Sequence, residues 1–466
     1  MSKSNITDQK RTLIFINIVI SCVAGSMLAT ALNTALPPII TDLHISVNTG
    51  QWLTSGFSLM MAVTMPLTAF LITRFPTKKL YCSAIFIFMA GLFLSAVSFN
   101  FPMMMLGRLV QAAGSGMMTS ISQVIILTIF PPEKKGSAMG WYGLSASAAP
   151  IIAPTIAGIL VDTVGWRMIF IATFVIVLIS FVFGLFVFSD VLDTSKKKFD
   201  TVSFIMSAFA FGGLTLGLGN IGSYGFLSIP VLATLSVGLL AAVLFVRRQL
   251  QLDEPLLELR ILKDKEYTVS VLGSMLLYFV MMGSTIILPL YIQQTLGLPA
   301  TVAGLVMLPG SLVTSVVSPF AGKLYDKLGM RVLFISGAIF LTLSNALMFF
   351  VGMDTSVWIV SAINIIRSVA IGCLMMPLVT WGASNLKPEM TAHATALLTS
   401  LRTIAGAIGS AVFVAVMTSV AAGSVSKYGE QASMRGVNVT FLAMAVGSAL
   451  LVILAILGTN TGKKQA

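Results

Sequence analysis

Fourteen long apolar runs follow one another through this chain, separated by short polar connections. A helix needs about 20 mostly apolar residues to cross a bilayer. Only 9% of the 466 residues are charged, whereas a soluble domain carries about 25%. Because so few charges cannot cover a water-facing surface, the runs predict an all-α integral membrane protein.

The apolar runs also predict how the chain is divided. Polar linkers near 189–200 and 247–266 separate an N-terminal six-helix bundle (1–190), a linker with two additional transmembrane helices (191–266) and a C-terminal six-helix bundle (267–466). The first run is longer than the core of a signal peptide, which spans about 7–15 residues, so we expect an uncleaved helix. The spans are expected at 12–37, 52–73, 80–98, 103–130, 137–161, 167–188, 201–223, 228–246, 267–293, 300–322, 331–352, 356–382, 392–420 and 436–458.

Basic residues are concentrated in alternate connections. With fourteen spans, 22 of the 28 lysines and arginines fall on the side that holds both termini, and three (Arg167, Lys427 and Arg435) fall on the other. Cytoplasmic loops of membrane proteins carry this excess. We therefore expect a multi-pass protein of the cell (plasma) membrane with cytoplasmic N- and C-termini. The same distribution explains the net charge of +12 without nucleic-acid binding.

Two stretches of the sequence resemble each other at a constant offset of 253 residues. PLTAFLITRFPTKKL begins at Pro66, and PFAGKLYDKLGMRVL begins at Pro319. Both lead from the end of a second helix into a basic loop. Related halves are typical of transporters that rock two bundles around a site near the bilayer midplane, so we expect two pseudo-symmetric bundles.

Several motifs resemble the major facilitator superfamily. GKLYDKLGMR (322–331) resembles its G-x-L-x-D-x-x-G-x-R loop signature, and GRLVQAAGSG (107–116) resembles its fourth-helix motif. APIIAPTIAG (149–158) is similar to the antiporter motif of the fifth helix. LNTALPPI, GQWLTSGF and GWRMIF are similar to segments of the fourteen-helix drug:proton antiporter family, which holds multidrug and lincomycin-resistance-type exporters.

The resemblance implies export of varied, often lipophilic compounds, driven by proton entry and needing no cofactor. Its partners would be a small-molecule substrate, protons and the bilayer. Thr73 replaces the Asp usual in the first loop copy, and Leu28 stands where many relatives carry an Asp. The implied gating-loop residues are Arg74, Lys78, Gly322, Asp326, Gly329 and Arg331, and the implied fifth-helix residues are Pro150, Pro154 and Gly158.

Three arginines fall inside spans, where charge is costly and usually functional. Arg367 and Arg402 each lie about 10 residues from a helix end, hence roughly 15 Å deep. We expect them to give a central cavity positive potential; structural arginines bound to carbonyls are the open alternative. Gln111 follows Arg108 by three residues and Asn364 precedes Arg367 by three. The expected cavity residues are Asn33, Arg108, Gln111, Tyr142, Asn364, Arg367 and Arg402.

Proton coupling requires a titratable group that each side reaches in turn. None of the 16 acidic residues lies within the core of a span. The candidates are His393 near the inside, and Asp162 and Asp42 near the outside. Asp162 and Arg167 would form either an outer gate pair or an exposed salt bridge. Asp326 is expected at an inner gate, paired with basic loop residues or with a helix N-terminus.

The sequence leaves one alternative function open and disfavours another. A dedicated exporter of an anionic metabolite, lipid or nucleotide is the alternative that the intramembrane arginines favour. An enzyme or receptor is disfavoured, because the sequence has neither a catalytic Ser-His-Asp set nor a phosphate-binding loop. Cys22, Cys82 and Cys373 are far apart within apolar runs, so we expect packing residues and no metal site. One chain holds both halves, which is compatible with a monomer.

Overall fold

The computed structural model describes residues 7–192, 194, 199–219, 221, 228–387 and 390–459. This part of the chain contains fourteen α-helices of 19 residues or more and no β-strand. Thirteen of them are long and apolar enough to cross a membrane, and the 30-residue α5 is the fourteenth long helix. The prediction of an all-α, fourteen-helix membrane protein is confirmed. The helices are α1 (Asp8–Asp42), α2 (Val47–Arg74), α3 (Thr77–Ala96), α4 (Phe101–Ile129), α5 (Lys135–Val164), α6 (Arg167–Val187), α7 (Thr201–Gly219), α9 (Ile229–Gln251), α10 (Lys265–Leu290), α11 (Ala300–Leu328), α12 (Met330–Phe349), α13 (Val357–Ser384), α14 (Thr391–Tyr428) and α15 (Ala432–Gly458).

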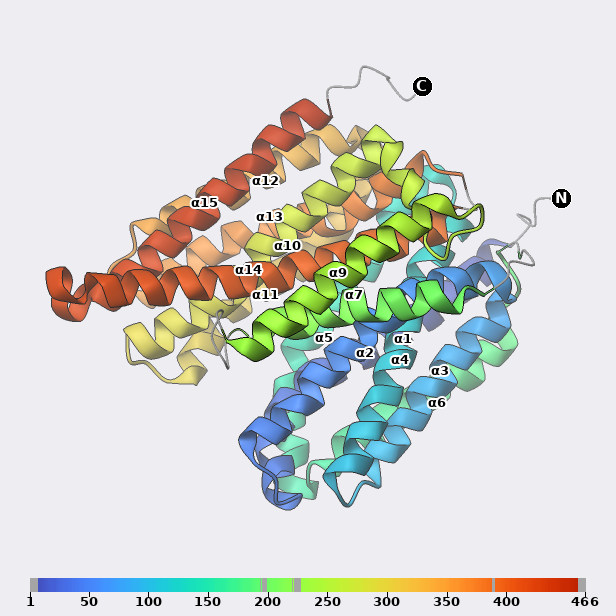
Figure 1. Cartoon of the computed structure of the whole chain (residues 1–466), viewed down its shortest axis with the longest axis horizontal. Coiled ribbons are helices and arrows are strands. Elements are labelled where there is room, and N and C mark those ends of the chain that lie inside the picture. The colour runs from blue at the N-terminus through green and yellow to red at the C-terminus, as the bar shows by residue number, and fades with distance from the viewer. Residues whose placement is uncertain are drawn as a thin grey trace.

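Helices α1–α6 and α10–α15 form two related bundles (Figure 1). Helices α3 and α12 each have 20 residues, and their first residues are 253 positions apart, the offset of the sequence repeat. Packing follows the same relation: α1 contacts α5 as α10 contacts α14, and α3 contacts α4 and α6 as α12 contacts α13 and α15. The predicted pseudo-symmetry is therefore present in the packing.

Glycines allow the helices within each bundle to approach closely. A Cβ atom at Gly114 of α4 would overlap the backbone of Phe88 in α3. A Cβ at Gly409 of α14 would overlap the carbonyl of Phe279 in α10. Small residues at such crossings are typical of helices that associate in lipid, where close backbone packing replaces the hydrophobic effect.

The bundles meet mainly along α5 against α11 and α2 against α14, with smaller contacts of α5 with α13 and of α4 with α14. Helix α1 begins and α15 ends on the same side of the molecule, which we call the basic end. Away from the basic end the two bundles diverge (Figure 1). Glycines on α5 and α11 agree with this arrangement: a Cβ at Gly136 or Gly322 would meet the opposite bundle, but Gly158 and Gly304 face open space.

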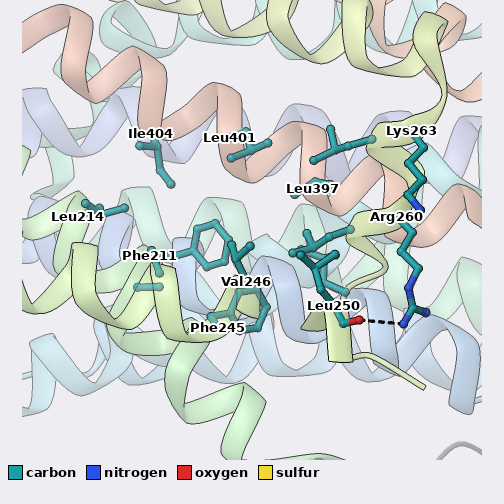
Figure 2. A pocket seen from close by; sticks show the side chains of 15 residues that line it. Phe211, Leu214, Phe245, Val246, Leu250, Arg260, Lys263, Leu397, Leu401 and Ile404 are labelled. Carbon is teal, nitrogen blue, oxygen red and sulfur yellow. Dashed lines mark hydrogen bonds between the residues drawn. The ribbon is translucent and has the colours of Figure 1, made fainter. Parts of the chain in front are cut away.

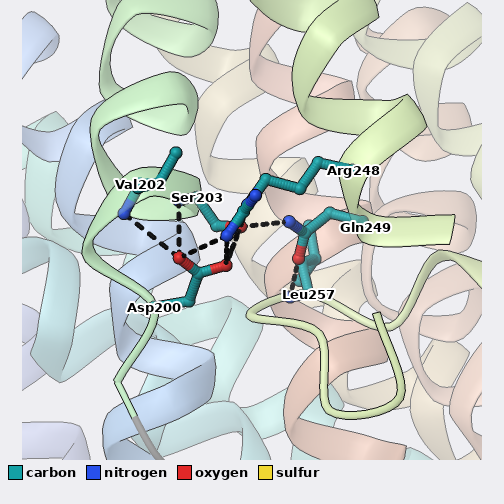
Figure 3. Close-up of polar contacts among 6 residues, drawn as sticks. All are labelled: Asp200, Val202, Ser203, Arg248, Gln249 and Leu257. Atoms are coloured by element: carbon teal, nitrogen blue, oxygen red, sulfur yellow. Dashed lines mark hydrogen bonds and ion pairs between the residues drawn. The ribbon is translucent and has the colours of Figure 1, made fainter. Parts of the chain in front are cut away.

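Helices α7 and α9 form a separate pair that packs on α2 and α14. Gly213 and Gly238 lie at their crossing, where a Cβ on either would overlap the other backbone. Asp200 precedes α7 and receives hydrogen bonds from the Nε and Nη2 atoms of Arg248 in α9, at 3.0 and 3.1 Å (Figure 3). Such a two-pronged arginine–carboxylate contact fixes geometry as well as charge.

The same network reaches the segment that leads into the second bundle. Gln249, which is fully buried, donates from Nε2 to the Ser203 hydroxyl at 2.7 Å. Its Oε1 accepts from the backbone N–H of Leu257 at 3.1 Å (Figure 3). Two helices and one linker are therefore held together at the basic end by a few polar side chains.

Candidate functional site: a polar layer between the bundles

A cavity of about 150 Å³ lies on the inner side of the first bundle. Five helices contribute to it, and hydroxyl, thiol, thioether and aromatic groups form its wall. Of the predicted cavity residues, Tyr142 is part of this wall; the three intramembrane arginines are not. The lining residues are Ser21, Cys22, Gly25, Ser26, Ala29, Phe57, Met61, Phe88, Ser115, Met118, Thr119, Ser122 and Tyr142.

Tyr142 links this cavity to the second bundle. Its phenol interacts with the Gln123 side chain and lies within electrostatic range of the Arg402 guanidinium. Arg402 belongs to α14, and its guanidinium carbon is 4.8 Å from the ring centre of Tyr278. A cation held over an aromatic face is stabilised by the ring quadrupole. Arg402 therefore lies close to residues of both bundles.

Polar atoms without partners cluster around Arg402. Its Nε and Nη1 atoms are buried and have no hydrogen-bond partner among the described residues. The same is true of the hydroxyl groups of Thr395 and Thr399, which share the Arg402 face of α14, and of Gln123 Oε1 on α4, a helix that packs on α14. Buried polar groups are nearly always paired, because an unpaired one costs about 1–3 kcal/mol. We call these residues, together with Tyr142, the polar layer.

Arg108 is buried within the first bundle. Its Nε donates to the Leu53 carbonyl at 3.2 Å, its Nη1 donates to Gln111 Oε1, and its guanidinium carbon is 4.2 Å from the ring centre of Phe57. The side chain is 1% exposed. These contacts link α4 to α2, as expected for an arginine that braces helices.

Arg367 repeats this arrangement in the second bundle. Its Nε donates to Asn364 Oδ1 at 3.1 Å, and its Nη2 donates to the same oxygen. Gln111 and Asn364 are separated by the repeat offset of 253, so the two amides occupy corresponding positions, with their arginines three residues away on opposite sides. Unlike Arg108, Arg367 keeps one nitrogen, Nη1, without a partner among the described residues.

Acidic side chains are confined to the helix ends. Each Asp or Glu within a described helix lies within two residues of a terminus. Asp42, the last residue of α1, accepts from Arg167 Nη1 at 2.9 Å and from Trp166 Nε1 at 3.2 Å. The expected pairing of Arg167 with Asp162 is therefore wrong, because Arg167 turns toward α1; Asp162 is exposed near the end of α5.

His393 lies near the basic end of α14 and is 2% exposed. Its Nδ1 accepts from the backbone N–H of Glu258 at 3.4 Å. The imidazole is therefore covered by the segment that follows α9. This contact joins a titratable group to the linker between the accessory pair and the second bundle.

The bundles close tightly at the basic end. The Asp326 carboxylate of α11 accepts from the backbone N–H groups of Gly136 and Ser137 at 2.8 and 2.7 Å, at the start of α5. A carboxylate suits this position because a helix N-terminus carries partial positive charge and free N–H groups. Gly322 contacts the Gly136 carbonyl so closely that a Cβ would overlap it.

The other residues of the loop and fifth-helix motifs lie at helix ends or within α5. Gly329 separates α11 from α12 with a φ of 73°, which favours glycine. The Lys78 N–H donates to Asp190 Oδ1 at 3.0 Å, and the Arg74 and Arg331 side chains are exposed. The α5 backbone stays helical through Pro150 and Pro154. The side chains of Pro150, Pro154 and Asn33 lie outside the part of the chain that the structure describes.

Sequence reasoning missed the hydroxyls of α14. Thr395 and Thr399 are four residues apart and Arg402 follows three later, so the three share one helix face. That spacing was the available signal. Serine and threonine in apolar helices commonly bond their own backbone, as Thr403 does with the Thr399 carbonyl at 2.8 Å, so composition alone does not single them out.

Two repeated six-helix bundles around a buried polar layer define a membrane transporter rather than an enzyme. Residues 14–410 match the family model of the Major Facilitator Superfamily, and the chain belongs to that superfamily. It is 37% identical to the uncharacterized MFS-type transporter YcnB of Bacillus subtilis, over 91% of this chain and 90% of that one. The predicted family is confirmed.

The names of two other relatives state a function. The chain is 35% identical to the lincomycin resistance protein LmrB of Bacillus subtilis, covering 87% of this chain and 85% of that one. It is 28% identical to the multidrug export protein EmrB of Escherichia coli, covering 84% and 77%. The solved human organic anion transporter MFSD10 superposes with a TM-score of 0.67 over 96% of this chain and 100% of that chain, at 13% identity, which shows a shared fold.

Proposed function

We propose that this chain exports small, lipophilic compounds across the cell membrane by proton-coupled alternating access. The polar layer carries the proposal, because it places unpaired buried donors and acceptors where the two bundles meet. The names of the relatives, lincomycin resistance and multidrug export, support this substrate class. No cofactor is required, since the proton gradient supplies the energy.

The basic end is proposed to face the cytoplasm. Positive charge favours that side, and Arg74, Lys78 and Arg331 lie there. With this orientation, the contact of Asp326 with α5 closes the cytoplasmic side, and the divergent ends open outward. The structure then corresponds to the state that releases substrate outside. Breaking the Asp326 contact would begin the return to the inward-open state.

Substrate recognition is assigned to the cavity wall and the polar layer together. Phe57, Phe88 and Met118 offer adaptable apolar surface, and Tyr142 supplies a polar group beside it. Methionine and aromatic side chains adapt to ligands of different shapes. Arg402 and the α14 hydroxyls would then bind the polar part of a substrate. Arg108, Gln111, Asn364 and Arg367 are assigned a bracing role at the rim of this region.

Proton coupling is assigned to His393, because no carboxylate lies deep in a described helix. His393 is buried at the basic end beneath the segment that follows α9, and movement of that segment would expose it to the cytoplasm. An imidazole is the side chain best suited to exchange protons near physiological pH. Asp42 and Asp162, at the opposite end, are the candidates that would receive protons from outside.

A second candidate function is export of an anionic compound, such as a metabolite, lipid or nucleotide. The unpaired Arg402 nitrogens favour it, because they would bind a carboxylate or phosphate strongly. Uptake into inverted membrane vesicles separates the two functions. Concentration of lincomycin and ethidium supports the first proposal, whereas concentration of an anionic fluorescein derivative alone supports the second. Uptake equal to that of vesicles without the protein contradicts both.

A further inference from the structure

A second cavity, larger than the one lined by Tyr142, lies outside the polar layer. It has a volume of about 410 Å³ and is bounded by the accessory helices α7 and α9, by the segment after α9, and by α14. Its wall is almost entirely apolar, with Phe211, Phe245, Leu401 and Ile404 among the lining side chains. Arg260 and Lys263 also line it, and they are its only charged residues.

The cavity has an apolar end and a charged end. Figure 2 shows Leu214 and Ile404 on one side and Arg260 and Lys263 on the other. Leu214 is thirteen residues from the start of α7, and Ile404 is thirteen from the start of α14. Both helices start at the basic end, so the apolar end reaches about 20 Å into the membrane at 1.5 Å per residue. That depth is comparable to the hydrocarbon thickness of one leaflet, and Arg260 and Lys263 then lie at the level of the lipid headgroups.

The cavity opens sideways. Val246 and Leu250 of α9 are 44% and 49% exposed, and Leu262 beside the cations is 38% exposed. Because α7 and α9 lie outside the two bundles, these exposed side chains face the surrounding bilayer. A molecule can therefore enter from the lipid without passing through the transport pathway.

The two cations differ in their existing contacts. Arg260 Nη2 donates to the carbonyls of Leu250 and Leu252 at 3.1 and 2.9 Å, and Arg260 Nη1 lies 3.6 Å from Glu258. The arginine is therefore fixed in place by the chain. Lys263 forms no ion pair within the described ranges and is exposed, so its charge is available to a ligand.

We propose that this cavity binds an anionic phospholipid of the cytoplasmic leaflet, with one acyl chain between α9 and α14 and the phosphate at Lys263 and Arg260. The combination of a long apolar slot and cations at one end matches that amphiphile. Basic pockets at this level of a membrane protein recognise acidic headgroups. The proposal uses the orientation proposed above but not the export activity.

A lipid bound in this cavity would contact α14, the helix that carries Arg402, on the face opposite that arginine. Leu397, Leu401 and Ile404 face the cavity, at spacings of four and three residues. Thr395, Thr399 and Arg402 each lie two residues before one of these side chains. Two residues correspond to a rotation of about 200° around a helix. The side chains that line the cavity and those that belong to the polar layer therefore lie on opposite faces of α14. A bound lipid would pack against the face of α14 that is opposite Arg402.

The test counts bound lipid by native mass spectrometry on the full chain in micelles containing equimolar dioleoyl phosphatidylglycerol and phosphatidylcholine. The wild type should retain phosphatidylglycerol preferentially. Lys263→Gln should lower that preference about fivefold, the effect of one surface cation on an anionic lipid. The matched control is Lys79→Gln, an exposed lysine at the basic end of α3, which should leave the preference unchanged.

A second variant tests the slot itself. Ala242 of α9 lines the cavity, so Ala242→Phe should fill it and reduce retention of both lipids, with folding checked by size exclusion. An unchanged preference in Lys263→Gln, an equal loss in Lys79→Gln, or full lipid retention by Ala242→Phe would overturn the proposal. Since no gradient or substrate is used, failure of the export proposal leaves this result unaffected.

Discussion

Asp326 of α11 accepts a hydrogen bond from the backbone N–H of Gly136 at 2.8 Å, so a side chain of one bundle caps a helix of the other. The neighbouring Ser137 N–H binds the second carboxylate oxygen at 2.7 Å. One acidic residue therefore contributes two hydrogen bonds to the closed basic end. The corresponding loop of the first bundle has Thr73 at that position, and Thr73 bonds its own helix at the Phe70 carbonyl. The two halves are thus related in fold but not in how they close.

Asp326→Asn should weaken the closed basic end. An amide keeps the size of the side chain, but its NH2 group cannot accept one of the two hydrogen bonds. The charge that favours a helix N-terminus is also lost, and together these changes cost about 1–3 kcal/mol. Spin labels at Lys79 and Lys327, in a variant without native cysteines, should report a longer distance. Glu133→Gln, a nearby exposed carboxylate, is the control. An unchanged distance in Asp326→Asn would show that the bond does not hold the bundles together.

Gly322→Ala should separate the same helices by steric contact. A Cβ at Gly322 overlaps the Gly136 carbonyl, and the contact is with backbone, which cannot move aside. Gly304→Ala on the same helix is the matched control, because nothing lies within 4 Å of its Cβ. The first variant should lose most transport at unchanged expression, and the second should keep it. Equal transport by both variants would argue against tight packing of α5 on α11 as the seal.

Asp200→Asn should loosen the accessory pair. Burial alone would raise the pKa of Asp200, but hydrogen bonds from Ser203 and the charge of Arg248 outweigh it, so the pKa lies below its usual value. A lowered folded pKa contributes stability above the unfolded pKa of about 3.9, and that stability is lost only as the pH falls through the folded value. The ion pair should therefore be intact throughout pH 5–8.

The measurement for Asp200→Asn is thermal unfolding in detergent at pH 5, 6.5 and 8. The variant should melt several degrees below the wild type by the same interval at each pH, because the carboxylate is ionised across that range. Asp253→Asn, an exposed residue of the same linker, is the control. A deficit that disappears at pH 5 would mean that Asp200 is already protonated there.

Arg402→Gln should reduce export of anionic or zwitterionic compounds about tenfold. A charged hydrogen bond in a buried site contributes about 1.5–3 kcal/mol, and Arg402 has two nitrogens available for it. Arg402→Lys keeps the charge over Tyr278 and should retain part of the activity. Arg435→Gln, an exposed arginine near the opposite end, is the control. Loss of cationic dye export to the same extent would point to a structural role for Arg402.

The fold was predictable because its determinants are local. Length and hydropathy define each span, and the alternation of basic loops fixes the number of spans, so the helices from α1 to α15 follow from the sequence. The repeat around Pro66 and Pro319 even indicated which helices correspond. No tertiary information is needed for these steps, since a helix in lipid satisfies its own backbone.

Side-chain partners were less predictable because they depend on how helices are rotated. Arg108 and Arg367 have similar sequence surroundings, yet only Arg367 keeps an unpaired nitrogen. Arg167 lies closer in sequence to Asp162 than to Asp42, but pairs with Asp42. The spacing within α14 indicates which side chains share a face, but not which distant helices that face contacts, so neither the partners of the polar layer nor the cavity between α7, α9 and α14 follows from the sequence.

Proton movement measured together with substrate movement tests the account most directly. Proteoliposomes carrying an internal pH dye would be given lincomycin under an imposed pH gradient, with the wild type and His393→Gln compared side by side. We expect the wild type to couple drug movement to proton flux in the opposite direction, and His393→Gln to lose that flux. Drug transport without any substrate-dependent proton movement in the wild type would contradict the proposal.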